Sequence, residues 1–229
     1  MSHSLAEVFP PFGLRVTCGP LVLRGITDEL IMPLVEVARA GVHDQDPSAS
    51  PLAFDWTAVP PQYLAINYAK WAWNNRNLFT ADSWILALAV EYEGVVVGVQ
   101  EGKGEKFRTD RSISTGSWLG RSAHGRGIGT LMRQVFCTFA IDHLGAEQML
   151  SEAFIDNPAS ARVSEKTGYQ RIGSRPVPRG EFGEVEEVMF RLTPQTLVRP
   201  DEPLHVEGLE PLRRYLGLDG SPGNTAEVA

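Results

Sequence analysis

The stretch TGSWLGRSAHGRGIGTLMRQ, residues 115–134, decides the fold of this chain. A β-type run ends at Leu119, and the glycine-rich turn HGRGIG (124–129) opens a helix predicted over 128–144, where apolar residues recur at three- and four-residue steps. Three glycines in the turn let the backbone approach a ligand closely, and the first N–H groups of the helix lie at the positive end of its dipole. The turn is therefore predicted to bind an anion such as a pyrophosphate.

The charge distribution agrees with an anion site at this place. The 229 residues carry 21 Lys and Arg against 28 Asp and Glu, a net charge of −7 that disfavours generic binding to duplex nucleic acid. Between residues 101 and 133, seven basic residues stand against three acidic ones, a local net charge of +4. A solvated basic face would give the same run of charge.

Two nucleotide-binding motifs fit the turn poorly. A Walker loop, GxxxxGK[ST], needs a lysine and a hydroxyl where Arg126 and Gly127 stand. A dinucleotide fingerprint, GxGxxG, needs glycine in place of Thr130 and a preceding parallel strand, whereas the preceding runs look like an antiparallel meander. Both nucleotide-binding interpretations are therefore disfavoured.

The rest of the chain predicts one domain with alternating strands and helices. The expected order is β, α, α, β, β, β, α, β, α, β, β, from residues 14–26, 27–41, 62–77, 84–92, 95–100, 112–119, 128–144, 147–154, 158–167, 169–175 and 185–192. Residues 14–26, counted here as one element, are expected to form two short β segments broken by the turn dipeptide Gly19-Pro20. The segment 42–61 is a long loop with four prolines, and loops of this length are usually functional. The aromatic helix 62–77 is expected to pack on the sheet or against a second subunit.

The cysteines and the apolar runs of the chain indicate in which cellular compartment the protein is expected. Cys18 and Cys137 are too few for a disulfide framework and lack metal-binding spacing, which favours reduced thiols in a cytosolic protein without a metal. Neither a signal peptide nor an apolar run long enough to cross a membrane is visible, so a cytoplasmic location with no membrane partner is expected.

The turn matches [Q/R]xxGxG/A, the pyrophosphate loop of the GNAT N-acetyltransferases. TGSWL (115–119) resembles the GYW[IL] strand that precedes this loop, and NPASARVSEKTGY (157–169) resembles the NxxSxxxxEKxGF/Y helix and strand that follow it. With three motifs in order, the chain resembles the GNAT superfamily. Within it, the sequence is most similar to the branch of ribosomal-protein-alanine acetyltransferases, including actinobacterial members described as succinyltransferases.

This resemblance implies an α/β (α+β) fold with a mixed, mostly antiparallel seven-stranded sheet flanked by helices. The GNAT domain would span residues 1–193, and residues 194–229 would add a short docking strand or helix and a frayed tail. The implied activity is transfer of an acetyl or succinyl group from acetyl-CoA or succinyl-CoA, by direct attack in a ternary complex, to an amine of a small molecule, a protein N-terminus or a lysine. A homo-oligomer is compatible with it, and the alternative is a non-catalytic acyl-CoA sensor or interaction protein.

The resemblance also assigns residues to the acyl-CoA. Ser117, Trp118 and Leu119 would face the pantetheine, with the Leu119 N–H polarising the thioester carbonyl. The pyrophosphate would bind the turn through Gly125, Arg126, Gly127, Ile128, Gly129 and Thr130, while His124 stands where Gln or Arg is usual. Asn157 would reach the pantetheine amide, although its Asn-Pro context also predicts a plain helix cap, and Ser160 would contact the cofactor.

Attack by a neutral amine needs a proton acceptor, an oxyanion donor and an acid for the leaving thiolate. Ser164 stands where many family members have a tyrosine acid, and Ser114 stands near the place of a fourth-strand carboxylate base. Glu152 is the candidate base. His43 and Asp44 lie in the expected acceptor loop, where a local His–Asp hydrogen bond is the alternative, and Gln100, Lys106 and Arg111 are the candidates for binding a succinyl carboxylate.

Overall fold

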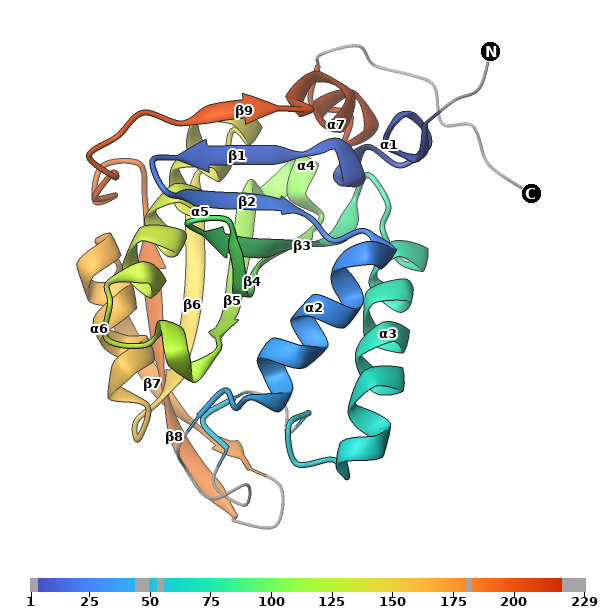
Figure 1. Ribbon diagram of the computed structural model, residues 1–229. Helices are drawn as coiled ribbons and strands as arrows, with labels where there is room; N and C mark the ends of the chain where they lie inside the picture. Colours follow the sequence, from blue (N-terminus) through green and yellow to red (C-terminus); the bar gives the residue numbers. More distant parts are fainter. Residues whose placement is uncertain (1–3, 44–49, 53–55, 180–182, 220–229) are drawn as a thin grey trace.

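Nine strands form one sheet with the order β7-β8-β6-β5-β4-β3-β2-β1-β9 (Figure 1). The computed structural model describes residues 4–43, 50–52, 56–179 and 183–219. The strands are β1 (Arg15–Cys18), β2 (Leu21–Gly25), β3 (Ser83–Tyr92), β4 (Val95–Glu105), β5 (Ser112–Leu119), β6 (Gln148–Phe154), β7 (Gln170–Pro178), β8 (Glu184–Leu192) and β9 (His205–Glu207).

The predicted strand number, seven, is wrong for two reasons. The expected break at Gly19-Pro20 is confirmed and forms the turn of the β1–β2 hairpin, so residues 14–26, which were counted as one element, contribute two strands. At the edge, β9 adds to β1 through the pairs from Arg15↔Glu207 to Thr17↔His205. The expected strand of the C-terminal extension thus forms as part of the main sheet.

The meander predicted before the glycine-rich turn is confirmed. Strands β3, β4 and β5 pair antiparallel in chain order. In contrast, β5 and β6 are parallel, and their register covers four pairs, from Ser112↔Gln148 to Thr115↔Ser151. Beyond Thr115 and Ser151 the two strands are no longer paired, which leaves a gap in the sheet.

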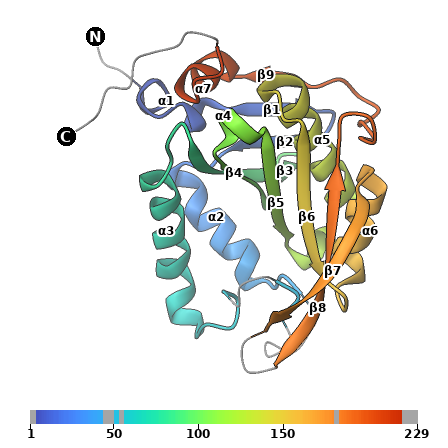
Figure 2. The same ribbon diagram turned by 180° about the vertical axis from the view of Figure 1, so that it is seen from behind.

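Helices pack on both faces of the sheet. Helix α2 (Asp28–Arg39) lies beside α3 (Pro61–Asn77) and packs with Ala89, Val99 and Trp118 in one core cluster (Figure 1). The opposite face carries α5 (Ile128–Leu144), which packs in a second cluster with Leu86, Leu88 and Ile113, and α6 (Pro158–Thr167) lies against α5 (Figure 2). Helix α3 buries Tyr68 against the sheet, whereas Tyr63 and Trp73 are about half exposed.

The capping signals predicted for α6 are confirmed. The Asn157 side chain caps the helix by accepting a hydrogen bond from the Ser160 N–H (3.1 Å), Pro158 is the first helical residue, and Gly168 ends the helix with φ +101°. Two short helices were not expected, α1 (Leu5–Val8) and α4 (Phe107–Asp110). A single helical turn is too short to show an apolar period in the sequence.

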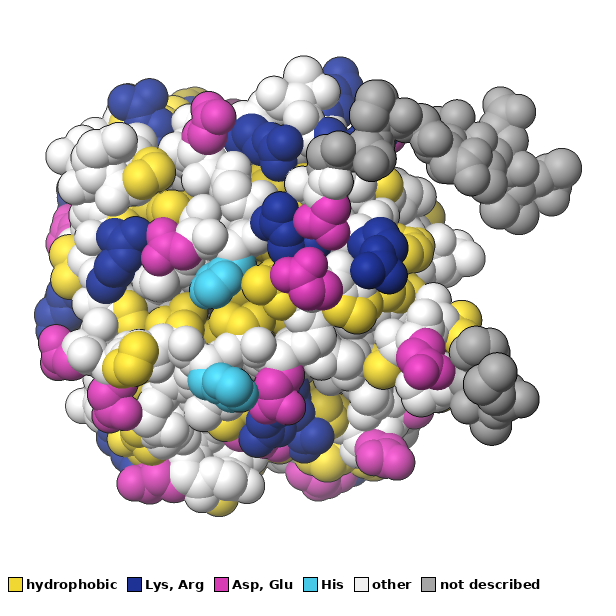
Figure 3. Space-filling view, turned by 90° about the horizontal axis from the view of Figure 1, so that it is seen from above, with side chains coloured by type: hydrophobic (Ala, Val, Ile, Leu, Met, Phe, Trp, Pro, Cys, Tyr) yellow, Lys and Arg dark blue, Asp and Glu magenta, His cyan; other side chains and the backbone are white. Residues whose placement is uncertain are grey.

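The C-terminal extension docks on the core. Helix α7 (Leu209–Tyr215) and the residue after it place Leu212 and Leu216, both fully buried, in the α5-side cluster. The Val198 N–H donates to the Thr167 carbonyl (2.9 Å) and so ties the extension to the end of α6. On the face that carries β9 and α7, Figure 3 shows acidic and basic side chains interspersed among hydrophobic ones rather than gathered by sign. The tail predicted to fray, 220–229, lies outside the described residues.

Candidate active site

A cleft of about 760 Å³ opens where β5 and β6 separate. Residues 116–119 line one side and residues 152–154 line the other. The glycine-rich turn and the start of α6 line the cleft from one face of the sheet, and Val42, His43 and Pro51, in the loop after α2, line it from the other. Because these two groups come from elements on opposite faces, the cleft passes through the sheet.

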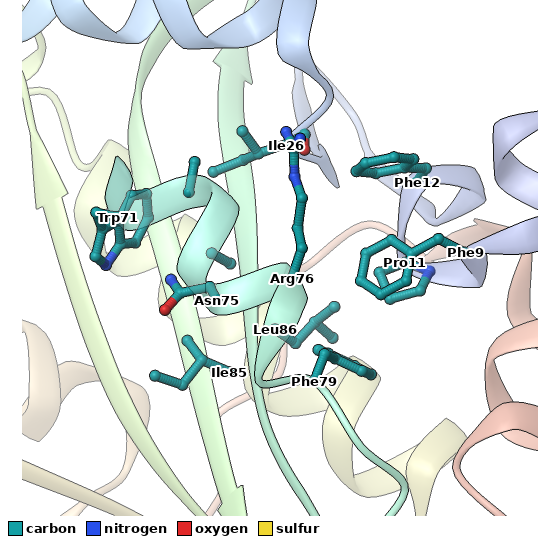
Figure 4. A pocket seen from close by; sticks show the side chains of 12 residues that line it. Phe9, Pro11, Phe12, Ile26, Trp71, Asn75, Arg76, Phe79, Ile85 and Leu86 are labelled. Atoms are coloured by element: carbon teal, nitrogen blue, oxygen red, sulfur yellow. Dashed lines mark hydrogen bonds between the residues drawn. The ribbon is translucent and has the colours of Figure 1, made fainter. Parts of the chain in front are cut away.

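A second cavity is too small to compete with this cleft. It lies among α3, β3 and the 3-10 helix η1 (Pro10–Gly13), with Trp71, Asn75 and Ile85 on one side and Phe12 on the other (Figure 4). Its volume of about 30 Å³ gives room for about one water molecule. The through-sheet cleft is therefore the candidate site for a coenzyme-sized ligand.

The glycine-rich turn forms an open cradle at the N-terminus of α5. Gly125 and Gly127 have φ of +72° and +79°, and a Cβ atom at either position would meet nothing within 4 Å. The Thr130 N–H already donates to the Gly127 carbonyl (3.1 Å), so the backbone donors left open at this end belong to the residues before it. Ile128 is buried beneath the turn. Open donors, space and the helix dipole together fit a pyrophosphate.

Strand geometry directs the Leu119 N–H into the cleft. The N–H of Gly120 donates to the Val97 carbonyl on β4 (2.8 Å). Because backbone groups of successive residues point to opposite sides of a strand, the N–H groups of Leu119 and Ser117 point away from β4 and into the gap. His124 Nε2 lies 3.0 Å from the Leu119 carbonyl oxygen, so the histidine of the turn is held against this strand.

The basic residues between 101 and 133 do not gather at the cleft. The Arg126 guanidinium lies 5.3 Å from the centre of the Tyr92 ring and 3.7 Å from Glu93, on the β3–β4 hairpin. Arg108 pairs with Asp82 (2.7 Å). Lys106 and Arg111 flank α4, and neither is among the residues that line the cleft in the described part of the chain. The local charge of +4 is therefore dispersed, and the structure does not bring the two predicted carboxylate-binding cations to the site.

One cation of this segment, Arg133, does line the cleft. It is only 3% exposed and donates four hydrogen bonds to uncharged side chains. The acceptors are Gln100 Oε1 (3.2 Å), Thr115 Oγ1 (3.0 Å), Ser151 Oγ (3.1 Å) and Ser117 Oγ (2.7 Å). Gln100, predicted to bind an acyl carboxylate, is fully buried beneath Arg133. Sequence reasoning missed Arg133, although a basic residue beside the apolar positions Met132 and Phe136 was the available signal.

Ser164 lies behind the cleft wall. Its side chain is fully buried, and its Oγ lies 3.3 Å from Ser151 Oγ, which in turn accepts a hydrogen bond from Arg133. The predicted acid is thus connected to the cleft through Ser151 and Arg133.

Two carboxylates face the side of the sheet covered by α2 and α3. Glu152 lines the cleft and accepts a hydrogen bond from Arg175 (2.8 Å). Burial and the neighbouring Glu187 raise the pKa of Glu152, while Arg175 lowers it. Glu101, which sequence reasoning missed, is paired with Gly116 in the β4–β5 register, and burial raises its pKa to about 7. Because successive side chains of a strand point to opposite faces of the sheet, the position of Glu101 directly after Gln100 could have placed it on this face.

The comparison with protein families decides the identity of the fold. A family model described as "Acetyltransferase (GNAT) domain" matches residues 21–170. This chain belongs to the GNAT acetyltransferase family. The resemblance inferred from the three motifs is therefore confirmed, and so is the expected fold class apart from the strand number.

Solved structures show the same GNAT fold at low sequence identity. RimJ of Mycobacterium smegmatis, in complex with CoA-disulfide, is 17% identical, with a TM-score of 0.64 over 88% of this chain and 92% of that one. RimL, a ribosomal alpha-N-protein acetyltransferase in complex with coenzyme A, is 18% identical, with a TM-score of 0.62; the match covers 76% of this chain and 94% of RimL. MccE, a microcin self-immunity acetyltransferase in complex with acetyl-CoA and AMP, is 14% identical, with a TM-score of 0.54; the match covers 76% of this chain and 92% of MccE.

The loop after α2 and the start of α6 contain the remaining predicted residues. His43 lines the cleft with Nε2 3.0 Å from Thr57 Oγ1, whereas Asp44 lies outside the described residues. Asn157 lines the cleft too; besides capping α6, it donates from Nδ2 to the Pro51 carbonyl (3.1 Å) and so holds the loop after α2. Ser160 also lines the cleft, and its N–H binds Asn157.

Two further observations concern ligands and membranes. Within the described ranges, His, Cys, Asp and Glu side chains form no group of three or more that could hold a metal ion. No helix in this part of the chain combines the length and apolar character needed to cross a membrane.

Proposed function

We propose that this protein is an acyl-CoA-dependent N-acyltransferase that moves an acyl group from CoA to an amine by direct attack in a ternary complex. The observation that carries the proposal is the cleft through the sheet. It leads from the open N–H groups at the start of α5, on one face, to the loop after α2 on the other. A long phosphorylated donor and a separate acceptor could thus meet in the middle from opposite sides.

The acyl-CoA substrate would be held by backbone groups for most of its length. The turn from Gly125 to Gly129 would bind the pyrophosphate, since open N–H groups and the α5 dipole both favour negative charge there. The edge of β5 freed by the separation would pair with the pantetheine, with Ser117 and Trp118 beside it. Asn157 and Ser160 would contact the same arm from the start of α6.

The transfer needs few groups beyond those that line the cleft. The amine nitrogen attacks the thioester carbonyl carbon, and the Leu119 N–H donates to the oxygen that becomes negative. Glu152 takes the proton from the attacking nitrogen, directly or through water, because it lines the cleft on the acceptor side. Glu101 is the second carboxylate on that face, and its exchange for glutamine tests which of the two accepts the proton.

The positions of the residues predicted to bind a succinyl carboxylate do not support succinyl as the transferred group. A succinyl carboxylate would need a cation with free donors, and the two cations predicted for it, Lys106 and Arg111, flank α4 away from the cleft. The family description also names acetyl transfer. Succinyl-CoA is retained as the second donor to be tested, and the acceptor is an amine on a small molecule, a protein N-terminus or a lysine.

A thiol-release assay tests the proposal against a non-catalytic acyl-CoA sensor. The protein is mixed with acetyl-CoA or succinyl-CoA and a panel of small amines, lysine peptides and N-terminal peptides, and free CoA thiol is followed with time. We expect amine-dependent release with at least one acceptor, and a fall of about 100-fold or more in Glu152→Gln. Binding of acyl-CoA without amine-dependent release across the panel would favour the sensor.

A further inference from the structure

Arg133 is a buried cation whose charge is not balanced by its hydrogen-bond partners. Its four acceptors are the hydroxyls of Thr115, Ser117 and Ser151 and the amide oxygen of Gln100. Removing a guanidinium from water carries a large desolvation cost, which neutral dipoles offset only in part. An anion that enters beside Arg133 would supply the missing charge.

The hydrogen-bond count limits what kind of anion fits. A guanidinium has five N–H groups. One at Nε, two at Nη1 and one at Nη2 are occupied by the four acceptors, so a single N–H at Nη2 remains. A carboxylate binds best to two parallel N–H groups of one edge, whereas a single atom that accepts one hydrogen bond matches the one donor left.

The position of Arg133 points to the sulfur of the acyl-CoA as that atom. Thr115 and Ser151, two of its acceptors, form the last pair before β5 and β6 separate. Ser117, which accepts a hydrogen bond from Nη2 of Arg133, precedes Leu119 by two residues, about 7 Å of strand. A thioester whose carbonyl oxygen binds the Leu119 N–H would therefore have its sulfur close to Nη2 of Arg133.

The positive charge of Arg133 also acts on the thiol of a neighbouring cysteine. Cys137 follows on α5 one helical turn later, and burial raises the pKa of its thiol to about 11. The positive charge of Arg133 acts against that rise. The field of the guanidinium thus acts on a sulfur atom in the same low-dielectric region.

We propose that Arg133 donates a hydrogen bond from Nη2 to the sulfur of the acyl-CoA and stabilises the thiolate as the carbon–sulfur bond breaks. This inference rests on the proposed function. As the carbonyl re-forms from the tetrahedral intermediate, the carbon–sulfur electron pair moves to sulfur, and the new carbon–nitrogen bond stays. The proton lost by the amine is on Glu152, and the thiolate takes a proton from solvent when CoA leaves.

The assignment explains how a serine can stand where an acid is expected. Serine alone is a weak acid, and the buried Ser164 reaches the cleft through Ser151. Ser151 in turn binds Nη1 of Arg133. With a fixed positive charge beside the sulfur, the thiolate can depart before it is protonated, and Ser164 acts by positioning Ser151 and Arg133.

The test measures the ionisation of CoA bound to the intact protein. The ultraviolet absorbance of the thiolate is titrated with pH in the CoA complex, and the same titration with desulfo-CoA is subtracted to remove the protein's own thiols and tyrosines. We expect the bound CoA thiol to ionise at least about 1 pH unit below free CoA. Arg133→Met should abolish this difference, and Arg133→Lys, which keeps the charge, should retain much of it.

Arg162→Met is the matched control, since Arg162 also lines the cleft but lies on the exposed face of α6. It should leave the thiol titration unchanged. If Arg133→Met does not fold, the wild-type and Arg133→Lys titrations remain decisive. A bound thiol that titrates like free CoA, or an unchanged titration in Arg133→Met, would overturn the inference alone. If neither CoA nor desulfo-CoA binds, the proposed function fails as well.

Discussion

Thr115 and Ser151 form the last pair between the parallel strands β5 and β6, and both hydroxyls accept hydrogen bonds from Nη1 of Arg133, at 3.0 and 3.1 Å. One side chain of α5 thus bridges the two strands at the point where they part. The bridge fixes the closed end of the cleft, while the glycine-rich turn before α5 forms the end that we propose binds the pyrophosphate. A single helix therefore positions both ends of the proposed acyl-CoA site.

The C-terminal extension contributes to the stability of the GNAT core. Leu212 of α7 is fully buried in the α5-side cluster, so Leu212→Ala should lower the free energy of unfolding by about 2 to 5 kcal/mol. Urea denaturation measures the change, with Leu5→Ala, at a side chain 72% exposed, as the control. A loss below about 1 kcal/mol would show that α7 docks only loosely.

A side chain at Gly116 should block transfer without unfolding the protein. Gly116 lines the cleft, and a Cβ atom there would meet nothing within 4 Å. Gly116→Val should reduce kcat/KM for acyl transfer at least about tenfold, while stability changes by no more than about 0.5 kcal/mol, because valine suits a strand. Ser112→Val, on the same face of β5 but before the strands separate, should keep its activity. Full activity in Gly116→Val would mean that the acyl group lies elsewhere.

The acidic limb of the pH–rate profile should depend on Arg175. Arg175 lowers the pKa of Glu152, and the base must lose its proton to work, so Arg175→Met should move this limb to higher pH by about half a unit or more. Activity well above the limb should be preserved. Arg171→Met is the control. Arg171 lies on the same strand as Arg175, and this substitution removes a surface ion pair with Glu165. An unmoved limb would argue against Glu152 as the proton acceptor.

Glu101 should make stability depend on pH. Its pKa is about 7 in the folded protein, against an ordinary value of 4.5, so the folded state keeps the proton while the unfolded chain has lost it. Stability is therefore lost as the pH rises from about 4.5 to about 7. Glu101→Gln should stabilise the protein by roughly 2 kcal/mol at about pH 8 and by little at about pH 4.5, measured by urea unfolding.

Glu105→Gln provides the comparison for Glu101→Gln. Glu105 lies on the same strand, and its hydrogen bond with Lys103 lowers its pKa. This substitution should give no gain at about pH 8. An equal effect of Glu101→Gln at both pH values would show that Glu101 is not held protonated by burial.

The local signals in the sequence were sufficient for the elements that form the cleft. The turn at 124–129, the helix that follows it and the capped helix after Asn157 each depend on residues close together in the chain, and all three form as predicted. Local spacing also predicted the positions of Leu119 and Gly127 in the fold, because β5 ends at Leu119 and α5 begins directly after Gly127.

The contacts between distant segments could not be predicted in this way. Lys106 and Arg111 were chosen by strand order, but α4 and its flanking residues, both with positive φ, take them away from the cleft. Arg133 acts through acceptors on three strands, and β9 pairs with a strand almost 200 residues earlier. Such relationships arise only when the strands take their places in the sheet.

The most direct test of the central claim is calorimetric titration of acetyl-CoA into the wild-type protein, Gly127→Glu and Gly145→Glu. Gly127 and Gly145 have similar positive φ, +79° and +77°, and neither would crowd a Cβ atom, but they lie at opposite ends of α5. We predict micromolar binding to the wild type and to Gly145→Glu, and none to Gly127→Glu, because its carboxylate fills the phosphate cradle and repels the pyrophosphate. Equal binding by the two variants, or no binding by the wild type, would contradict the claim that this turn holds an acyl-CoA.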